Sequence, residues 1–406
     1  MTKSKEFGPG ILIAAAFIGP GTVTVCTIAG AQYQFVLLWA MVFSIIATIV
    51  LQEMSARLGL IANKGLSKAV RDEFKSPFLK GLAVLLIISA ILIGNAAYEA
   101  GNISGGALGL ETLMTQSTIQ AGSFNLNIFS LLIGLVAFVI LFIGQYKVIE
   151  KALVALVVLM SIAFVMTAIM TQPNLLLVLK GLFIPSTPEG SLLVIIALIG
   201  TTVVPYNLFL HSSLVQEKWS GAKDLSKARK DTVISIIIGG LVSIAIIVSA
   251  AAIENSQVNN AADLAKGLEP LFGQYAKYLL AIGLFSAGIT SAITAPMAAA
   301  YVVSDCFNWQ STLKSSRFRI IWMIVLLLGI LFSSIGFKSI EVIKFAQVAN
   351  GLLLPLIALF LLWIMNSKKV LGDYANSLKQ NILGGIIVII TLILGLKSLA
   401  KVFGWL

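Results

Sequence analysis

The chain has 406 residues, of which 58% are hydrophobic and only 11% are charged. About a quarter of the residues of a typical soluble protein are charged, so this composition excludes a water-soluble globular protein and indicates an integral membrane protein. The mean hydropathy of +1.00 agrees with that class. The net charge of +11 does not indicate a nucleic-acid-binding protein, because the basic residues are concentrated in alternate loops.

Eleven apolar segments are predicted to cross the membrane within one domain that spans residues 1–406. In chain order they cover residues 9–31, 36–58, 79–109, 126–145, 149–171, 191–216, 232–253, 270–304, 318–336, 341–366 and 382–402. The alternative is a count of ten or twelve. Cys26 and Cys306 fall in or beside these segments, and we expect them to pack as apolar residues instead of forming a disulfide or a metal site.

The loops between the spans predict the orientation of the chain. All five arginines and nine lysines lie in three alternate loops, at residues 57–80, 218–230 and 314–319. The intervening loops 110–125 and 172–190 contain a single basic residue, Lys180. Because cytoplasmic loops are rich in Lys and Arg, the amino terminus is predicted to be cytoplasmic and the carboxyl terminus extracytoplasmic. The predicted location is the plasma membrane, with multiple passes.

The first and sixth spans are interrupted by residues that form poor helix. The first contains Gly19-Pro20-Gly21-Thr22, and the sixth contains Pro205. Proline removes an intrahelical hydrogen bond and clashes with the preceding turn. Since the two breaks are five spans apart, we expect two five-helix repeats of inverted topology over about 9–171 and 191–366, followed by an extra helix over about 382–402.

Non-helical backbone is tolerated at membrane depth only where it is buried in protein or lines a cavity. Two matched breaks would face each other near the midplane and present N–H donors and carbonyl acceptors to a substrate. We therefore predict a substrate site that is non-helical near residues 19–22 and 203–206. The alternative is that Gly-Pro-Gly is a simple kink.

Four segments carry longer motifs. They are LQEMSARLG at 51–59, LFLHSSLV at 208–215, FSAGITSAITAPMAAAYVVSDCF at 285–307 and QVANGLLLPLIALFLLWIM at 347–365. These segments resemble the second, sixth, eighth and tenth helices of the NRAMP family of metal-ion transporters. The resemblance covers spans one to ten. It implies an all-α membrane protein with the LeuT-type fold, which ion-coupled uptake systems use.

The departures from the family pattern fall at the predicted site. The family has Asp-Pro-Gly-Asn at the first break, where this chain has Gly19-Pro20-Gly21-Thr22. Val204 replaces the metal-binding methionine of the family, and Tyr206 replaces its first histidine. Manganese and iron favour imidazole, carboxylate and sulfur ligands, and a divalent ion in the membrane needs compensating charge. The resemblance therefore does not carry over the family's usual metal site.

The predicted substrate-binding residues offer neutral groups instead. They are Gly19, Pro20, Gly21, Thr22, Val203, Val204, Pro205, Tyr206, Asn207 and Gln347. Gln347 matches a family residue that approaches the ion and shares a helix face with Asn350, although interhelical hydrogen bonding is the alternative for both. Glycine allows backbone N–H groups to approach an anion closely, which favours a small polar, zwitterionic or carboxylate-bearing solute. The alternatives are a divalent cation such as magnesium at a modified site, and a non-transporting scaffold.

Two ionisable residues are candidates for proton coupling. Glu99 is the most deeply placed carboxylate and resembles the acidic residue of the family's third helix, although the usual second acid is Ala96 here. His211 is the only histidine and matches the family's second histidine. The alternatives are a structural hydrogen bond from Glu99 to Ser104, Asn102 or a neighbouring helix, and a packing hydrogen bond for His211.

The sequence carries no metal-ligand His/Glu motif, no Cys–His pair and no phosphate-binding loop, so we do not expect an enzyme. It also carries no ATP-binding domain. No cofactor is expected, and the driving force would be an ion gradient, such as protons, or the gradient of the substrate itself. The expected surroundings are a lipid bilayer and a small solute or ion, with no nucleic acid, and the protein is expected to be a monomer.

Overall fold

The computed structural model describes residues 18–402 except 115–117, 122–123, 145–146, 254–257, 310–314 and 336. The first half of the chain contains α2 (Pro20–Tyr33), α3 (Leu38–Ala62), α4 (Leu66–Glu73), α5 (Pro77–Glu111), β1 (Thr118–Ala121), β2 (Phe124–Asn127), α6 (Ile128–Ile143), α7 (Lys147–Met170) and α8 (Leu175–Phe183). The second half contains α9 (Leu192–Thr202), α10 (Pro205–Lys218), α11 (Leu225–Ala250), α12 (Ala261–Ala265), α13 (Glu269–Phe272), α14 (Ala276–Phe307), α15 (Ser316–Ser334), α16 (Ser339–Ile364), α17 (Lys368–Leu371) and α18 (Leu378–Val402). Short 3₁₀ turns occupy Ala222–Asp224, Lys266–Leu268, Gly273–Tyr275 and Gly372–Tyr374.

Nine helical stretches of the described chain are long and apolar enough to cross a bilayer, with α9 and α10 counted together as Leu192–Lys218. The tenth is α6, which is apolar but has only 16 residues. The eleventh is α2, which forms the second part of the predicted first span, whereas residues 9–17 lie outside the described residues. These helices together account for the eleven predicted segments.

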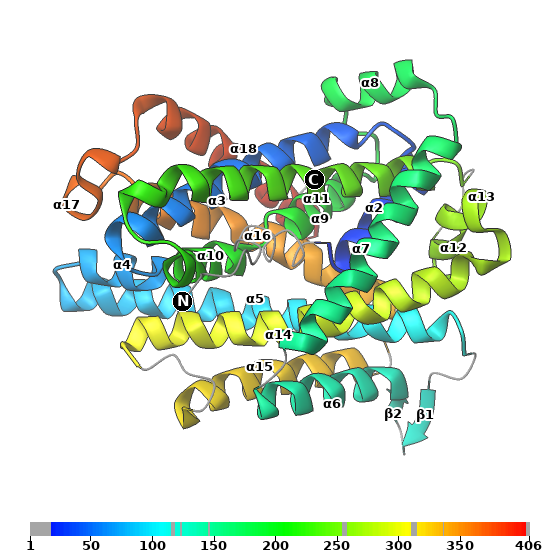
Figure 1. The fold of residues 1–406 in the computed structure, drawn as a ribbon, viewed down its shortest axis with the longest axis horizontal. Coiled ribbons are helices and arrows are strands. Elements are labelled where there is room, and N and C mark those ends of the chain that lie inside the picture. Colours follow the sequence, from blue (N-terminus) through cyan, green and yellow to red (C-terminus); the bar gives the residue numbers. More distant parts are fainter. Residues whose placement is uncertain are drawn as a thin grey trace.

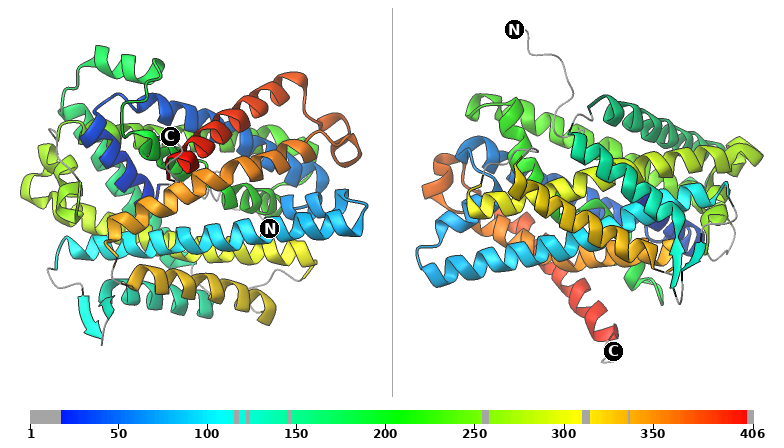
Figure 2. Two further views of the ribbon diagram at one scale, coloured as in Figure 1. Left: turned by 180° about the vertical axis from the view of Figure 1, so that it is seen from behind. Right: turned by 90° about the horizontal axis from the view of Figure 1, so that it is seen from below.

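Most of the long helices run roughly along one common direction (Figure 1). The long helix α5 crosses the middle of the molecule beside α14, with α15 and α6 on one side and α16, α3 and α11 on the other. The last long helix, α18, packs across α16 on the back of the bundle, and its end projects away from it (Figure 2). This arrangement places α5 and α16 against the two interrupted spans.

Several connections contain structure that the sequence analysis treats as loop. The basic loop 57–80 holds the amphipathic helix α4, whose Leu66, Ala69 and Val70 are buried. The loop 172–190 holds α8, and α11 begins at Leu225, inside the predicted loop 218–230. The strands β1 and β2 pair in antiparallel fashion, and most of this pair lies in the segment 110–125 that the sequence predicts to be a loop. Short helices and hairpins of this kind satisfy backbone hydrogen bonds at the ends of a bundle.

The loops that carry the arginines are held together by side-chain contacts. Arg71 donates hydrogen bonds to the carbonyl oxygens of Asp305 (3.3 Å) and Cys306 (3.1 Å) at the end of α14. Arg229 donates to Glu53 of α3 at 2.7 Å. These contacts place the basic loops 57–80 and 218–230 and the end of α14 at one end of the bundle, as alternation of the spans requires. Cys306 is buried and free, as is Cys26, so their predicted role in packing is confirmed.

Candidate functional site

Both interrupted spans restart as helices at a proline. Gly19 is extended, with φ −96° and ψ −177°, and α2 begins at Pro20. In the sixth span α9 ends at Thr202, Val203 and Val204 are not helical, and α10 begins at Pro205. Proline suits the first position of a helix because its fixed φ fits and its missing N–H would be unpaired there anyway.

The helices that follow the two predicted breaks therefore begin earlier in the sequence than expected. Residues 20–22 and 205–206 were expected to be non-helical, and the structure shows them in the first turns of α2 and α10. The described irregular backbone is limited to 18–19 and 203–204. The sequence prediction was wrong on this point because the prolines begin the second half-helices instead of lying inside the gaps.

The two breaks lie beside each other. The Thr22 hydroxyl of α2 and the Thr201 hydroxyl of α9 are 2.8 Å apart and share a buried hydrogen bond. Gln347 of α16 reaches the same place, because a Cβ atom added to Gly21 would overlap its side-chain amide. Gly21 is thus required for close approach of Gln347, and the predicted grouping of these residues is present in the structure.

The helix α5 forms another wall of the site. Its Gly105 abuts Pro20, at the start of α2. Its Tyr98 packs edge-to-face against Tyr206, with ring centroids 5.4 Å apart and an interplanar angle of 63°. Tyr98 and Thr201 were not among the residues predicted to form the site. The sequence signal that could have indicated Tyr98 is its helical spacing from the glycines of α5, which places them on one face.

Several buried amide atoms near the breaks have no hydrogen-bond partner within the described part of the chain. They are both amide atoms of Asn207, in the first turn of α10, together with Gln347 Oε1 and Asn350 Nδ2. All three side chains are at most 2% exposed. Because an unpaired polar group in a buried site is costly, these atoms are candidates to bind a polar solute.

Glu99 is fully buried but lies on a different face of α5 from Tyr98. Its Oε2 accepts a hydrogen bond from Asn102 Nδ2 at 3.3 Å, while Oε1 is unpaired among the residues described. Its side chain packs against Gly329 of α15. Successive helical residues point about 100° apart, so Glu99 is directed to α15 whereas Tyr98 is directed to α10. The structure therefore contains the Asn102 bond that the structural alternative predicts.

His211 lies one turn further along α10 than Asn207 and is fully buried. Its Nδ1 is 2.8 Å from Gln52 Oε1 of α3, and its Nε2 has no partner in the described structure. Since the neutral imidazole has one donor and one acceptor nitrogen, the Gln52 oxygen selects the tautomer with the proton on Nδ1. His211 thus keeps one acceptor nitrogen available near the second break.

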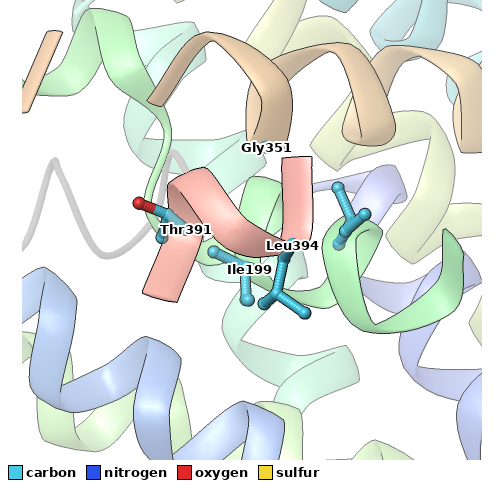
Figure 3. Close-up of a pocket in the computed structure, with 5 residues that line it drawn as sticks. Ile199, Gly351, Thr391 and Leu394 are labelled. Carbon is cyan, nitrogen blue, oxygen red and sulfur yellow. The ribbon is translucent and has the colours of Figure 1, made fainter. Parts of the chain in front are cut away.

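A narrow crevice lies on the side of α9 and α16 that faces α18 (Figure 3). It is too narrow to hold a water-sized sphere and is lined by Ile196, Ile199, Gly351, Thr391 and Leu394. The Thr391 hydroxyl donates to Ile387 of its own helix, so this surface is largely apolar. The crevice is a gap between packed helices beside the breaks, and the polar atoms described above do not line it.

The groups at the breaks are neutral side chains, backbone amides and helix ends. The first intrahelical bond of α2 runs from Val23 N–H to Gly19 O at 3.2 Å. The N–H of Gly21 comes before this bond, at a position where helical N–H groups have no acceptor within the helix. Within the described chain, no group of three or more His, Cys, Asp or Glu side chains is arranged to hold a metal ion. These groups can form hydrogen bonds and present the partial charges of helix ends.

Comparison with protein families gives a match over nearly the entire chain. Residues 10–401 match the model of the natural resistance-associated macrophage protein-like family, Nramp. The chain belongs to the Nramp family. Nramp proteins are membrane transporters and not enzymes, so this member is a multi-pass plasma-membrane transporter and the predicted class is confirmed.

Relatives of known name agree with this assignment. The Nramp chain is 27% identical over 403 residues to the divalent metal cation transporter MntH of Erwinia tasmaniensis, which covers 97% of this chain and 93% of the relative. A crystal structure of a mutant manganese transporter of Eremococcus coleocola has a TM-score of 0.76 at 20% identity, covering 98% of this chain and 87% of that one. MhsT in complex with L-phenylalanine has a TM-score of 0.62 at 16% identity, with 97% of both chains covered. These likenesses confirm the predicted LeuT-type fold with inverted repeats.

Proposed function

We propose that this Nramp-family transporter moves a small polar solute bearing a carboxylate, either an anion or a zwitterion, in place of manganese or iron. The observation that carries the proposal is the chemistry at the paired breaks. Gly19, Thr22 and Val204 stand where the family has Asp, Asn and Met, and the Thr22 hydroxyl is bonded to Thr201. A site of hydroxyl, amide and backbone groups provides no charge to compensate a dehydrated divalent cation.

The same site provides positive potential for a carboxylate. The N-termini of α2 and α10 both lie against α5, where Pro20 contacts Gly105 and Tyr206 contacts Tyr98. Helix N-termini carry partial positive charge and unpaired N–H groups, so two of them on one site favour an anionic group.

The unpaired amides supply the remaining contacts. Asn207 and Gln347 offer donors and acceptors that would otherwise be buried without partners, so binding a polar solute would satisfy them. A zwitterion would place its ammonium group near the carbonyl end of α9, where the last carbonyls of a helix carry partial negative charge. The organic ligand of MhsT shows that a protein of this fold binds an amino acid, L-phenylalanine.

Coupling to protons is proposed for Glu99 and His211. Each is fully buried and keeps one atom unpaired in the described structure, Glu99 Oε1 and His211 Nε2. An ionisable group within a membrane domain that can gain or lose a proton is suited to coupling. We also propose that the basic end of the bundle, which carries α4 and Arg229, faces the cytoplasm.

The proposal is tested by transport into liposomes that contain the purified protein. The wild type is compared with a variant in which Gly19→Asp, Thr22→Asn and Val204→Met restore the family's ligand types. A matched control carries Gly19→Asn with the same two other substitutions, which adds similar volume without the carboxylate. Uptake of manganese, magnesium, amino acids and short carboxylates is measured for all three proteins.

We expect organic solute uptake in the wild type alone and manganese uptake only in the variant with Gly19→Asp. The loss of one supporting group at a metal site commonly costs 10–100-fold in affinity, so loss of the carboxylate and the sulfur ligand should cost more. Saturable micromolar manganese transport by the wild type would contradict the proposal. Magnesium transport by the wild type without organic uptake would favour the divalent-cation alternative, which the name of the MntH relative also suggests.

A further inference from the structure

One face of α5 is built almost without side chains. Gly94, Tyr98, Gly101 and Gly105 are spaced by four, three and four residues, so they lie in one stripe along the helix. This stripe consists of three glycines and a single large residue, Tyr98. The repeat of small residues allows other helices to approach the α5 backbone closely, as small residues do in membrane proteins.

The glycines of the stripe are in contact with two helices of the site. A Cβ at Gly94 would lie 2.6 Å from Leu353 Cδ1 of α16, and one at Gly101 would lie 2.7 Å from Ala346 Cβ of the same helix. Gly105 abuts the ring of Pro20 at the start of α2. The backbone of α5 therefore contacts α16 on both sides of Tyr98, at Gly94 and Gly101, and contacts α2 one turn further along, at Gly105.

Tyr98 is the side chain that extends from this face toward the second break. It is 2% exposed, and its ring meets Tyr206 edge-to-face across a centroid distance of 5.4 Å. Tyr206 follows Pro205 directly, so the aromatic pair stands at the start of α10. Aromatic pairs in this arrangement have a defined geometry, which makes the position of both rings specific.

We infer that Tyr98 is a specificity-determining residue that limits the size of the solute held between the two breaks. The inference rests on the proposed function and adds to it that the solute has a compact body. The neighbouring positions of the stripe are glycines whose backbone contacts α16 and α2, so Tyr98 supplies the bulk of this face of α5 beside the start of α10. The ring of Tyr98 thus sets the space between α5 and the start of α10.

The test measures the size preference of transport with a graded set of probes. Liposomes containing wild type, Tyr98→Ala, Tyr98→Leu or Tyr98→Phe are assayed with straight-chain monocarboxylates from acetate to hexanoate and with amino acids from glycine to phenylalanine. The matched control is Tyr301→Ala. Tyr301 lies on α14 and makes a similar edge-to-face contact with Phe318, at 5.1 Å and 79°, so its loss removes an aromatic pair elsewhere in the bundle.

We expect Tyr98→Ala to raise the ratio of kcat/KM for the longer solutes over the shorter ones by at least about tenfold. One methylene group in an apolar pocket is worth about 10–200-fold in discrimination. Tyr98→Phe keeps the ring and should keep the wild-type ratio, and Tyr301→Ala should leave the ratio unchanged. If Tyr98→Ala does not fold, Tyr98→Leu should also raise the ratio of kcat/KM for longer over shorter solutes, by a smaller factor.

The failure of this inference is distinguishable from the failure of the proposed function. If the wild type carries organic solutes but the Tyr98 variants lower the uptake of all sizes equally, Tyr98 is structural and the proposed function stands. If the wild type carries none of the organic probes, both the proposed function and the size limit are overturned, whatever the Tyr98 variants do.

Discussion

The hydroxyl groups of Thr22 and Thr201 lie 2.8 Å apart and share a buried hydrogen bond, although 179 positions separate them in the sequence. Thr22 is in the first turn of α2, and Thr201 is in the last turn of α9. The bond therefore joins the two interrupted spans directly at their breaks. It also occupies the hydroxyl of Thr22, the residue that the family resemblance matches to a metal-binding asparagine.

This hydrogen bond should be measurable as a coupling between two substitutions. Thr22→Val and Thr201→Val each remove one hydroxyl, and each single change leaves the other hydroxyl without this partner. The double variant should lose less stability than the sum of the singles, with a coupling of about 0.6 kcal/mol, the mean for interhelical hydrogen bonds in membranes. Thermal unfolding of the purified protein checks this.

A control for this cycle is Thr391→Val, because the Thr391 hydroxyl donates only within α18, to Ile387 and Val388. It should show no coupling with Thr22→Val. Strict additivity of Thr22→Val and Thr201→Val would mean that the hydroxyl contact contributes nothing to the stability of the paired breaks.

Gly21→Ala should damage the protein through overpacking. A methyl group at residue 21 would overlap the Gln347 side chain, whereas a Cβ at Gly385 of α18 would meet nothing within 4 Å. Forced insertion into a packed interior costs about 1–3 kcal/mol, so we expect a lower Tm and reduced uptake for Gly21→Ala and no such effect for Gly385→Ala. Shortening the partner in Gly21→Ala with Gln347→Ala should restore the Tm. No recovery in the double variant would show that Gln347 is not the obstacle.

Glu99→Gln should flatten the dependence of solute uptake on external pH. The amide keeps the shape of the side chain but cannot exchange a proton, and Glu99 has one carboxylate oxygen without a described partner. Uptake is measured in liposomes across an imposed pH gradient. Glu111→Gln is the matched control, because Glu111 is a carboxylate of the same helix that accepts hydrogen bonds from Asn127 and Ser339. An unchanged pH profile in Glu99→Gln would remove Glu99 from the coupling mechanism.

Acid should loosen the attachment of α4. Burial alone would raise the pKa of Asp72, but hydrogen bonds from Arg71 at 2.7 Å and Lys64 at 3.0 Å lower that pKa below its ordinary value. A carboxylate with a lowered pKa in the folded state contributes stability above its unfolded pKa, and this is lost as the pH falls through the folded pKa. We therefore expect Asp72→Asn to destabilise the protein at neutral pH.

The difference in Tm between wild type and Asp72→Asn should shrink as the pH is lowered toward and below 4, because protonated Asp72 resembles asparagine in charge. Thermal unfolding from pH 7 to pH 3 measures this. A gap in Tm that stays constant over that range would show that the Asp72 ion pairs do not stabilise α4.

The sequence determined the membrane class, the number of spans and the break in the sixth span. Long apolar segments and prolines within them are local features, because hydrocarbon selects helices and each proline removes one intrahelical hydrogen bond. The family motifs likewise identified Gln347 as part of the site, and the structure places it against Gly21. The limits of each break were less predictable, since Pro20 and Pro205 begin helices here.

Tertiary structure alone decided which residues meet at the breaks. No local pattern connects Thr22 with Thr201, or Tyr98 with Tyr206, because these contacts depend on how α2, α5, α9 and α10 pack. The position of Glu99 was also decided by packing. Adjacent residues of a helix point about 100° apart, so Tyr98 faces the break while Glu99 faces α15, a difference that depends on the rotation of α5 in the bundle.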